Sequence, residues 1–523
     1  MLILFNGRVG LNPLQTAVAV EEDRIAAVGT DAEILALDRP GTQKINLGDK
    51  TLWPGLRDSH LHLEKFAISL QQVNCETRSR EECLARVREK ASTLTAGSWM
   101  LGRRWNQNEW ENRFGTAAEL DPVSLGHPVF LYDKSLHSAW VNSKALVMAG
   151  ITRSTPDPKG GIIQRDKVGD PTGILFETAV DLVDEVIPPP SSEERLNFMH
   201  AAQEQLIQVG LTNVTDFDPL TSYATLLEMQ QDQSLKLRVT KGIPIEKLDW
   251  AIEQGIQSGT CNGRIRWGSL KLFADGALGP QTAAMLRPYE DNSSNFGSLQ
   301  LTADEIFETG IRASSHGISL AIHAIGDRAT HEVLNGYGML REYEKRNHYS
   351  FLKHRIEHLQ LLHRDNLNKC AELGITASMQ PIHILSDMYT ADRCWGSRSA
   401  YAYAFHTLLN SGARLIFGSD APVASPNPFW GIHAAVTRRR QDGQPSVDGW
   451  NSQERISLTE ALSAYSNTPA ELENNSSHID IISSGQLADL IVLAENPYKI
   501  DPQQLFTLKP QGVMIGGEWV YQI

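Results

Sequence analysis

Two histidines near the start of the chain, His60 and His62, have the spacing of a metal-binding pair on a strand. Side chains two residues apart on an extended strand point to the same face, so both imidazoles can reach one point in space. Imidazole nitrogen is a common zinc ligand, and on a helix the corresponding spacing would be four residues. The pair therefore predicts part of a metal site, although so short a motif also occurs without a metal.

Further residues with suitable chemistry lie at the ends of later candidate strands: Lys271, His323, His358 and Asp420. Imidazole and carboxylate groups are suitable zinc ligands. The lysine differs, because an ammonium group has no lone pair and is repelled by a dication. If CO₂ adds to the amine, the resulting carbamate has two oxygens that can bridge two metals. The alternative is that Lys271 pairs with Asp275 or with a substrate.

The elements that position these residues form a repeating pattern of strands and helices. Counting the strand with the two histidines, eight strands are expected, the others being 211–217, 235–241, 265–273, 318–324, 351–358, 374–380 and 413–420. Thr302 with Glu305, and Ser457 with Glu460, have the spacing of capping boxes at helix starts. Eight strands alternating with helices predict an α/β (β/α)₈ TIM barrel, in which the strand-end residues meet at one mouth.

The remaining segments flank or interrupt this barrel. Short strand-like runs with turn signals such as Asn6-Gly7 occupy both ends of the chain, so we expect 1–53 and 475–523 to form one small β-sandwich. The barrel then comprises 54–65 and 196–474. The insertion 66–195 leaves the catalytic end of the first barrel strand, and we expect it to fold over the mouth as a cap.

Ordered motifs along nearly the whole chain resemble the amidohydrolase superfamily of metal-dependent hydrolases, and within it amidohydrolase family 3, which includes N-substituted formamide deformylases. The matching segments are residues 54–62, 105–107, 136–143, 173–177, 271–276, 281–283, 323–329, 354–360, 378–383, 418–423 and 485–490. Arg57 departs from the usual small or apolar residue before Asp58, and we expect it to face away from the site.

The resemblance implies a role for each strand-end residue. His60, His62 and Asp420 would hold one zinc ion, His323 and His358 a second, and carboxylated Lys271, formed with CO₂, would bridge them. A hydroxide between the metals would be the nucleophile, with Asp420 as the proton shuttle. The implied reaction is hydrolysis of a non-peptide carbon–nitrogen bond in an N-formyl, N-acyl or cyclic amide. Other divalent metals also suit these ligands.

His137 and His383 match the family's substrate-pocket positions, and Trp105 is a third candidate for substrate binding. Each of the histidines can equally be structural. Trp105 forms a pair with Trp110 that is expected to pack the insertion, with a place in the pocket as the lesser alternative. Asp327 is expected either to orient His323 or to form a salt bridge with Arg328.

The composition is that of an ordinary soluble globular protein, with 41% hydrophobic and 21% charged residues. A net charge of −14 argues against a nucleic-acid or anionic membrane partner. The family resemblance implies a small-molecule substrate. The five scattered cysteines contain no C-x-x-C pair, so neither a disulfide framework nor a cysteine-rich zinc site is indicated. With no signal peptide and no membrane-length apolar run, we expect a cytoplasmic protein. Family resemblance alone suggests a homodimer.

Two alternatives to the binuclear amidohydrolase stay open. The first is a mononuclear hydrolase of esters or amides, in which Lys271 is unmodified. The second is a regulatory or binding protein that keeps the fold without turnover. Degenerate members of the family usually lack ligands, and here the full set is present. A serine hydrolase is disfavoured because no G-x-S-x-G elbow precedes a helix.

Overall fold

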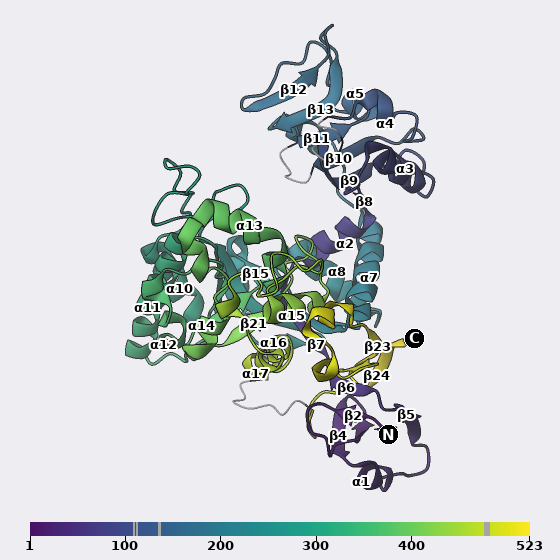
Figure 1. Cartoon of the computed structure of the whole chain (residues 1–523), viewed down its shortest axis with the longest axis vertical. Helices are drawn as coiled ribbons and strands as arrows, with labels where there is room; N and C mark the ends of the chain where they lie inside the picture. Colours follow the sequence, from purple (N-terminus) through teal and green to yellow (C-terminus); the bar gives the residue numbers. More distant parts are fainter. Residues whose placement is uncertain (108–109, 111–112, 134–137, 475–481, 523) are drawn as a thin grey trace. The chain divides into compact units, whose positions relative to one another are not determined.

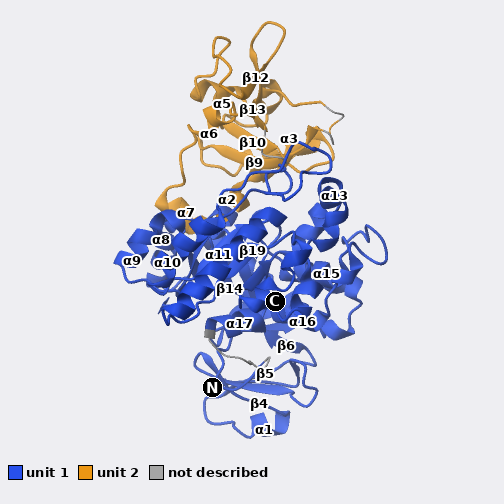
Figure 2. Cartoon of the chain, turned by 90° about the vertical axis from the view of Figure 1, so that its left-hand side faces the viewer, with its two compact units in different colours: residues 1–66, 199–523 blue, residues 67–198 orange. Residues whose placement is uncertain are grey.

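Figure 1 shows the computed structural model of the chain, which describes residues 1–107, 110, 113–133, 138–474 and 482–522. The chain divides into two compact units. Unit 1 contains residues 1–66 and 199–523, and unit 2 contains residues 67–198 (Figure 2). Among the described residues, none of the helices is long and apolar enough to cross a membrane.

Eight parallel strands of unit 1 form a nearly closed barrel, in the order in which they occur along the chain. They are β7 (Leu56–Leu61), β14 (Leu211–Asp216), β15 (Arg238–Pro244), β17 (Ile265–Phe273), β18 (Leu320–Ala324), β19 (Arg355–His358), β20 (Thr376–Met379) and β21 (Leu415–Phe417). A short strand, β16 (Cys261–Asn262), pairs antiparallel with β17. The predicted TIM barrel is confirmed.

Backbone hydrogen bonds close the barrel just beyond the ends of β7 and β21. The Asp420 N–H donates to the His60 carbonyl at 2.7 Å, and the His62 N–H donates to the Ala421 carbonyl at 2.8 Å. Gly418 allows this approach, because a Cβ there would lie 2.5 Å from the His60 nitrogen. The closure therefore brings the first and last predicted metal-binding segments side by side.

The helices of the barrel lie between and after its strands (Figure 1). They are α2 (Leu63–Gln71), α7 (Ser192–Gln208), α8 (Leu220–Gln231), α9 (Leu248–Glu253), α10 (Ala303–Ser314), α11 (Asp327–Arg346), α12 (Lys369–Glu372), α13 (Ile384–Trp395), α14 (Phe405–Asn410), α15 (Pro428–Thr437), α16 (Leu458–Ala464) and α17 (Asn467–Asn474). Both predicted capping boxes are present, at Thr302 before α10 and at Ser457 before α16. Each box satisfies backbone N–H groups that the first helical turn leaves free.

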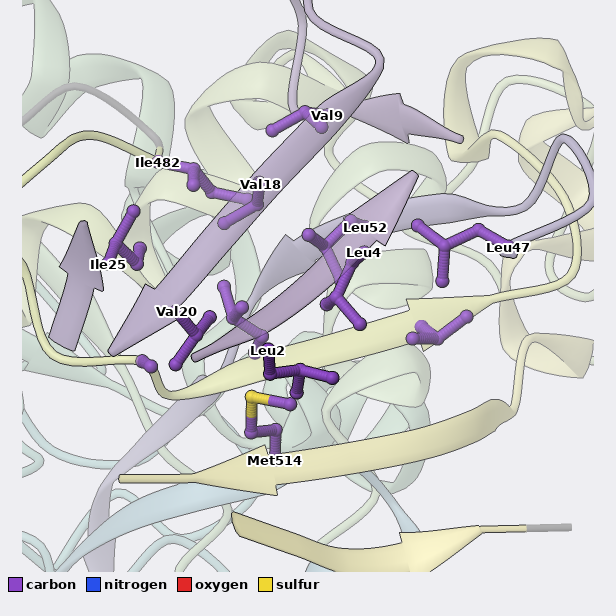
Figure 3. Close-up of a cluster of buried hydrophobic side chains, with 13 residues drawn as sticks. Leu2, Leu4, Val9, Val18, Val20, Ile25, Leu47, Leu52, Ile482 and Met514 are labelled. Atoms are coloured by element: carbon purple, nitrogen blue, oxygen red, sulfur yellow. The ribbon is translucent and has the colours of Figure 1, made fainter. Parts of the chain in front are cut away.

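Strands from both ends of the chain form the β-sandwich of unit 1. One sheet has the order β4 (Arg24–Gly29), β3 (Ala17–Glu21), β1 (Leu2–Phe5) and β5 (Gln43–Asn46), and α1 (Asp31–Leu35) follows β4. The other has the order β2 (Arg8–Val9), β6 (Thr51–Pro54), β22 (Leu490–Leu493), β23 (Pro510–Ile515) and β24 (Glu518–Gln522). Leu4, Val18, Leu52 and Met514 belong to the core that the two sheets share (Figure 3). Burial of such side chains stabilises each by about 1.5–3 kcal/mol.

An ion pair joins the sandwich to the barrel within unit 1. The Arg238 side chain on β15 donates through Nε and Nη2 to the carboxylate of Asp489, at 2.7 and 3.1 Å. Asp489 precedes β22 directly and also accepts the Gly516 N–H at 2.8 Å. This bidentate contact fixes the C-terminal strands against the barrel sheet.

Unit 2 is built on one six-stranded sheet. Its order is β12 (Gly161–Arg165), β13 (Pro171–Glu177), β11 (Ser138–Val141), β10 (Val129–Asp133), β9 (Met100–Trp105) and β8 (Val73–Asn74), with α3 (Arg80–Ala91), α4 (Ala117–Leu120), α5 (Ser143–Met148) and α6 (Asp181–Asp184). Trp105 and Trp110 stack with ring centroids 6.0 Å apart, and the Trp105 Nε1–H donates to the Leu131 carbonyl at 2.7 Å. The structure thus places Trp105 in the core of unit 2. A position of this unit over the barrel mouth stays a prediction.

A buried histidine on α15 makes the stability of the fold sensitive to acid. Burial, and secondarily the charge of Arg439, lowers the pKa of His433 from 6.5 to about 4. Between these values the unfolded chain binds more protons than the folded chain, so the free energy of unfolding falls as the pH decreases. From pH 7.5 to pH 5 His433 contributes a loss of about 2 kcal/mol.

Urea unfolding of wild type and His433→Asn at both pH values checks this expectation. The variant should lose less stability on acidification than wild type does. The exposed His316 supplies the matched control, because His316→Asn should keep the wild-type pH dependence. Equal pH dependence in wild type and His433→Asn would contradict the assignment.

Candidate metal centre

The first three predicted ligands converge at the closure of the barrel. His60 lies on β7, His62 directly follows it, and Asp420 lies just after β21. The Nε2 atoms of His60 and His62 lie 3.6 and 3.5 Å from Asp420 Oδ1. Their ligand atoms therefore form one group that can hold a metal ion.

Two buried carboxylates orient the histidines of this group. His60 Nδ1 lies 2.6 Å from Glu357 Oε2, and His62 Nδ1 lies 3.2 Å from Asp218 Oδ1. When each Nδ1–H donates to its carboxylate, each Nε2 keeps its lone pair for a metal. Both carboxylates are completely buried, with side-chain exposures of 0%.

These carboxylates are themselves held in place. The Arg355 guanidinium pairs with Glu357, its Nη2 donating to Oε2 at 3.1 Å. Asp218 Oδ2 accepts the backbone N–H groups of Glu64 and Lys65, at 2.6 and 3.1 Å. A carboxylate fixed in this way holds its histidine ring in one orientation before any metal binds.

Neither Glu357 nor Asp218 was identified as a site residue from the sequence. Signals for both exist in it. Charged residues inside an apolar barrel strand, as in Arg355-Ile356-Glu357-His358, are costly unless they pair. Asp218 follows the second barrel strand at the end where such folds carry their chemistry.

A second group of ligand atoms comprises His358, His383 and Asp420. These atoms all lie within 4.8 Å of one another. His383 ends the short 3₁₀ helix η4 (Pro381–His383), and its ring stacks on that of His358 with centroids 6.4 Å apart. The structure therefore brings His383, predicted as a substrate-binding residue, among atoms that can hold a metal.

Three buried nitrogens near Asp420 are candidates for binding a metal. Lys271 Nζ, His358 Nδ1 and His383 Nε2 have no hydrogen-bond partner among the described residues. An unpaired buried polar atom costs roughly 1–3 kcal/mol. These donors suit metal coordination, directly for imidazole and as a carbamate for lysine, so the residues present fit a metal centre.

Lys271 does not pair with Asp275, so that part of the alternative is wrong, and its pairing with a substrate stays a prediction. Asp275 accepts the N–H groups of Ala284, Ile325 and Gly326 at 2.8–3.0 Å. Lys271 Nζ instead lies 4.7 Å from the ring centroid of Phe217. The lysine is thus buried inside the barrel, and none of the described carboxylates is bonded to it.

His323 lies beside the centre but belongs to neither group of ligand atoms. Its ring centroid is 4.5 Å from that of His358. The His323 Nε2–H donates to the Gly276 carbonyl at 2.9 Å, which leaves Nδ1 as its free nitrogen. Its role as a ligand of the second metal stays a prediction.

Asp327 does neither of the things expected of it. It is buried at the start of α11, and its Oδ1 accepts the Leu286 N–H at 2.8 Å. This bond holds the loop after β17 against α11.

Arg57 forms an ion pair with Glu473 on α17. His137, another predicted substrate residue, lies outside the described residues.

Electrostatics keep the histidines in the form that binds metal. Burial, followed by the charge of Lys271, holds the pKa of His60 well below its usual range and lowers that of His323 to about 4. Burial, followed by the charge of His323, likewise lowers the pKa of His358. Neutral imidazole is the ligand form, so at neutral pH these groups need not lose a proton on binding a metal.

The lysine is also shifted toward its neutral form. Burial is the largest cause, and it lowers the pKa of Lys271 from 10.5 to about 8. Nearby Glu357 and Asp420 act in the opposite direction. A pKa of about 8 gives Lys271 a far larger neutral fraction at pH 7–8 than an exposed lysine has. Only the neutral amine can add to CO₂.

Two residues of the centre carry left-handed backbone conformations. The φ angles of His358 and Asp420 are 70° and 58°. For residues other than glycine this conformation costs roughly 1–3 kcal/mol and persists where the surroundings enforce it, as at functional sites. At both positions the chain turns directly after a barrel strand, so the strain accompanies the placement of the ligand atoms.

Comparisons with known proteins agree with this geometry. The profile of the amidohydrolase family matches residues 43–521. The chain is 32% identical to Protein LONG AFTER FAR-RED 3 of Arabidopsis thaliana, over 95% of this chain and 88% of that protein. It is 27% identical to the N-substituted formamide deformylase of Arthrobacter pascens, over 98% and 96%.

Solved structures show the same likeness. An uncharacterized metal-dependent hydrolase from Pyrococcus furiosus superimposes with a TM-score of 0.77 at 29% identity, covering 95% of this chain and 100% of that one. The family match spans the barrel strands, both groups of ligand atoms and the sandwich from β5 onward. The chain therefore belongs to the amidohydrolase family.

Proposed function

We propose that this protein is a metal-dependent hydrolase that cleaves a non-peptide carbon–nitrogen bond in an N-formyl, N-acyl or cyclic amide. The observation that carries the proposal is the pair of ligand groups that share Asp420. Glu357 and Asp218 orient two of the histidines toward that carboxylate. Similarity to an N-substituted formamide deformylase supports the choice of bond.

The first metal position comprises His60, His62 and Asp420, and the second His358 and His383 with the same carboxylate. Lys271 joins the second position as a carbamate: its neutral amine attacks CO₂, a N–C bond forms and one proton is released. We keep His323 as a further candidate ligand. When bound, the metals, proposed to be zinc, lower the pKa of a water molecule and polarise the scissile carbonyl.

The protein's own groups then move the proton. Asp420 accepts the proton of the attacking water and returns it to the leaving nitrogen, which makes the amine a better leaving group. Its position close to both histidine pairs supports this role. The completely buried Glu357 and Asp218 keep the rings fixed while this transfer occurs.

A mononuclear hydrolase is the second candidate. The observation that favours it is the unequal support of the two positions. Both histidines of the first group have a carboxylate on Nδ1, whereas His358 Nδ1 and His383 Nε2 have no partner within the described residues. In that case Lys271 stays an amine and contacts the substrate.

An amide panel tests the function. Protein loaded with zinc in bicarbonate buffer is incubated with N-substituted formamides, N-acyl amines and cyclic amides, and release of formate, carboxylate or amine is measured. We expect turnover of at least one class, with loss after chelation and recovery on adding zinc back. Absence of turnover in every class, or turnover unaffected by chelation, would contradict the proposal.

Replacing Glu357 by glutamine should weaken zinc binding by about tenfold or more, because the carboxylate that orients His60 becomes neutral. Competition with a chromophoric chelator gives the zinc dissociation constant of each variant. Glu342 is the matched control, since its side chain is 71% exposed and glutamine there should leave zinc affinity unchanged. Wild-type affinity in Glu357→Gln would show that this carboxylate does not support the metal.

A further inference from the structure

A cavity of about 290 Å³ lies inside the barrel, and some of its lining residues, such as Arg355 and Thr376, stand at the N-terminal ends of their strands. Residues from different strands line it, among them Thr215, Thr240, Ser269, Ser319, Arg355 and Thr376. The volume is roughly ten times that of one water molecule. Phe351, which is 62% exposed, belongs to the lining, so the cavity reaches the surface there.

The cavity results from short polar side chains on the inner face of the barrel. Ser269 lies two residues before Lys271 on β17, and Thr376 two residues before Ser378 on β20. Residues two apart share one face of a strand. Barrels of this type are usually filled here by valine, isoleucine and leucine. Hydroxyl-bearing side chains are too short to fill the same space, which leaves it open and polar.

Positive charge exceeds negative charge around the cavity. Its lining includes Arg266, Lys353, Arg355 and Glu473. Glu473 is already paired with Arg57, and Arg355 with Glu357. Among the described residues, the Arg266 Nη1 donates to the carbonyls of Gly259 and Glu473, at 3.1 and 3.4 Å.

The second unpaired cation is Lys353, whose Nζ donates to the carbonyls of Glu471 and Leu472. Burial, followed by the charge of Arg414, lowers its pKa. Within the described residues, neither Arg266 nor Lys353 therefore has a carboxylate partner. Within that part of the chain, the two cations contact backbone carbonyls of Gly259 and of the last turn of α17.

Hydroxyl donors accompany these cations. Ser269 Oγ lies 2.7 Å from Ser319 Oγ, which lies 3.1 Å from Ser258 Oγ. Hydroxyl protons can rotate toward an incoming acceptor. Guanidinium groups beside hydroxyls are the donors that recognise carboxylate, sulfate and phosphate.

We propose that this cavity is a binding site for a small oxyanion, held by Arg266 and Lys353 with the hydroxyls of the lining. The site is separate from the metal centre and does not depend on the proposed reaction. Arg355 nevertheless contacts both regions, since its guanidinium also holds Glu357, the partner of His60.

Isothermal titration calorimetry of the zinc-loaded full chain with sodium sulfate tests the site, with sodium chloride keeping the ionic strength constant. We expect one saturable site in wild type. Arg266→Gln should weaken sulfate binding by about tenfold or more, because a charge-assisted hydrogen bond is lost. Thr376→Leu, which fills the cavity, should also weaken it. Repeating the titration with acetate distinguishes a carboxylate from a tetrahedral oxyanion.

The exposed Arg312 on α10 gives the matched control, and Arg312→Gln should bind sulfate as wild type does. Circular dichroism verifies that each variant is folded. If Thr376→Leu does not fold, the sulfate titration of Arg266→Gln alone tests the proposal. The proposal is overturned if wild type shows no saturable site, if Arg266→Gln binds as tightly as wild type, or if Arg312→Gln loses as much affinity as Arg266→Gln.

Discussion

Replacing Asp420 by asparagine is expected to lower kcat of the zinc-loaded protein by about 10²- to 10⁴-fold, the range that a positioned acid–base group contributes. Asp420 is the one residue common to both ligand groups, and its Oδ1 lies 3.5 Å from His62 Nε2. Asparagine keeps the size and an oxygen ligand but removes the basic carboxylate. Turnover is measured with the substrate that the amide panel identifies.

Metal content separates the two ways in which this variant can fail. If it retains zinc and loses turnover, the missing function is proton transfer. If it loses zinc as well, the main role of Asp420 is to bind the metal. The matched control is Asp304→Asn, at an exposed position in the first turn of α10, which should leave kcat unchanged. Unchanged kcat in Asp420→Asn would rule out this carboxylate as the proton shuttle.

The second large effect is expected at Lys271. Replacement by methionine preserves an unbranched side chain in the buried position but offers no amine to CO₂. We expect the variant to bind about one zinc ion fewer than wild type and to lose most of its turnover, because the carbamate oxygens no longer join the second position. The lysine pKa of about 8 favours the reactive neutral amine as the pH rises toward 8.

Carbon-13 NMR tests the modification directly. Wild type prepared in ¹³C-bicarbonate should show a protein carbamate signal that Lys271→Met lacks. The exposed Lys247 provides the control, since Lys247→Met should keep both the signal and the zinc. A wild-type spectrum without a carbamate signal, together with full turnover in Lys271→Met, would favour the mononuclear mechanism.

Much of the fold follows from local patterns in the sequence. The barrel strands alternate with helices, and the capping boxes at Thr302 and Ser457 mark two helix starts where the structure has them. These signals are local, because hydrophobic periodicity and helix capping involve residues a few positions apart. The strand ends then place His60, His358 and Asp420 near one mouth by topology alone.

The contacts inside the site do not follow in the same way. Glu357 and His60 are separated by 297 positions and meet only because β7 and β19 line the same barrel. Lys271 and Asp275 are four positions apart, yet backbone N–H groups occupy the carboxylate. His383 follows a strand on a 3₁₀ turn whose direction sets its place among the ligand atoms. Such details depend on side-chain direction, which one sequence does not specify.

Metal content per chain is the most direct test of the proposed metal centre. Elemental analysis is made on full-length protein purified without chelator in bicarbonate buffer, before and after addition of zinc. The two ligand groups that share Asp420, with Lys271 unpaired beside them, predict about two zinc ions per chain. One ion would restrict the centre to His60, His62 and Asp420. No bound metal, even after zinc is added back, would contradict a metal-dependent hydrolase and favour a binding protein that keeps the fold.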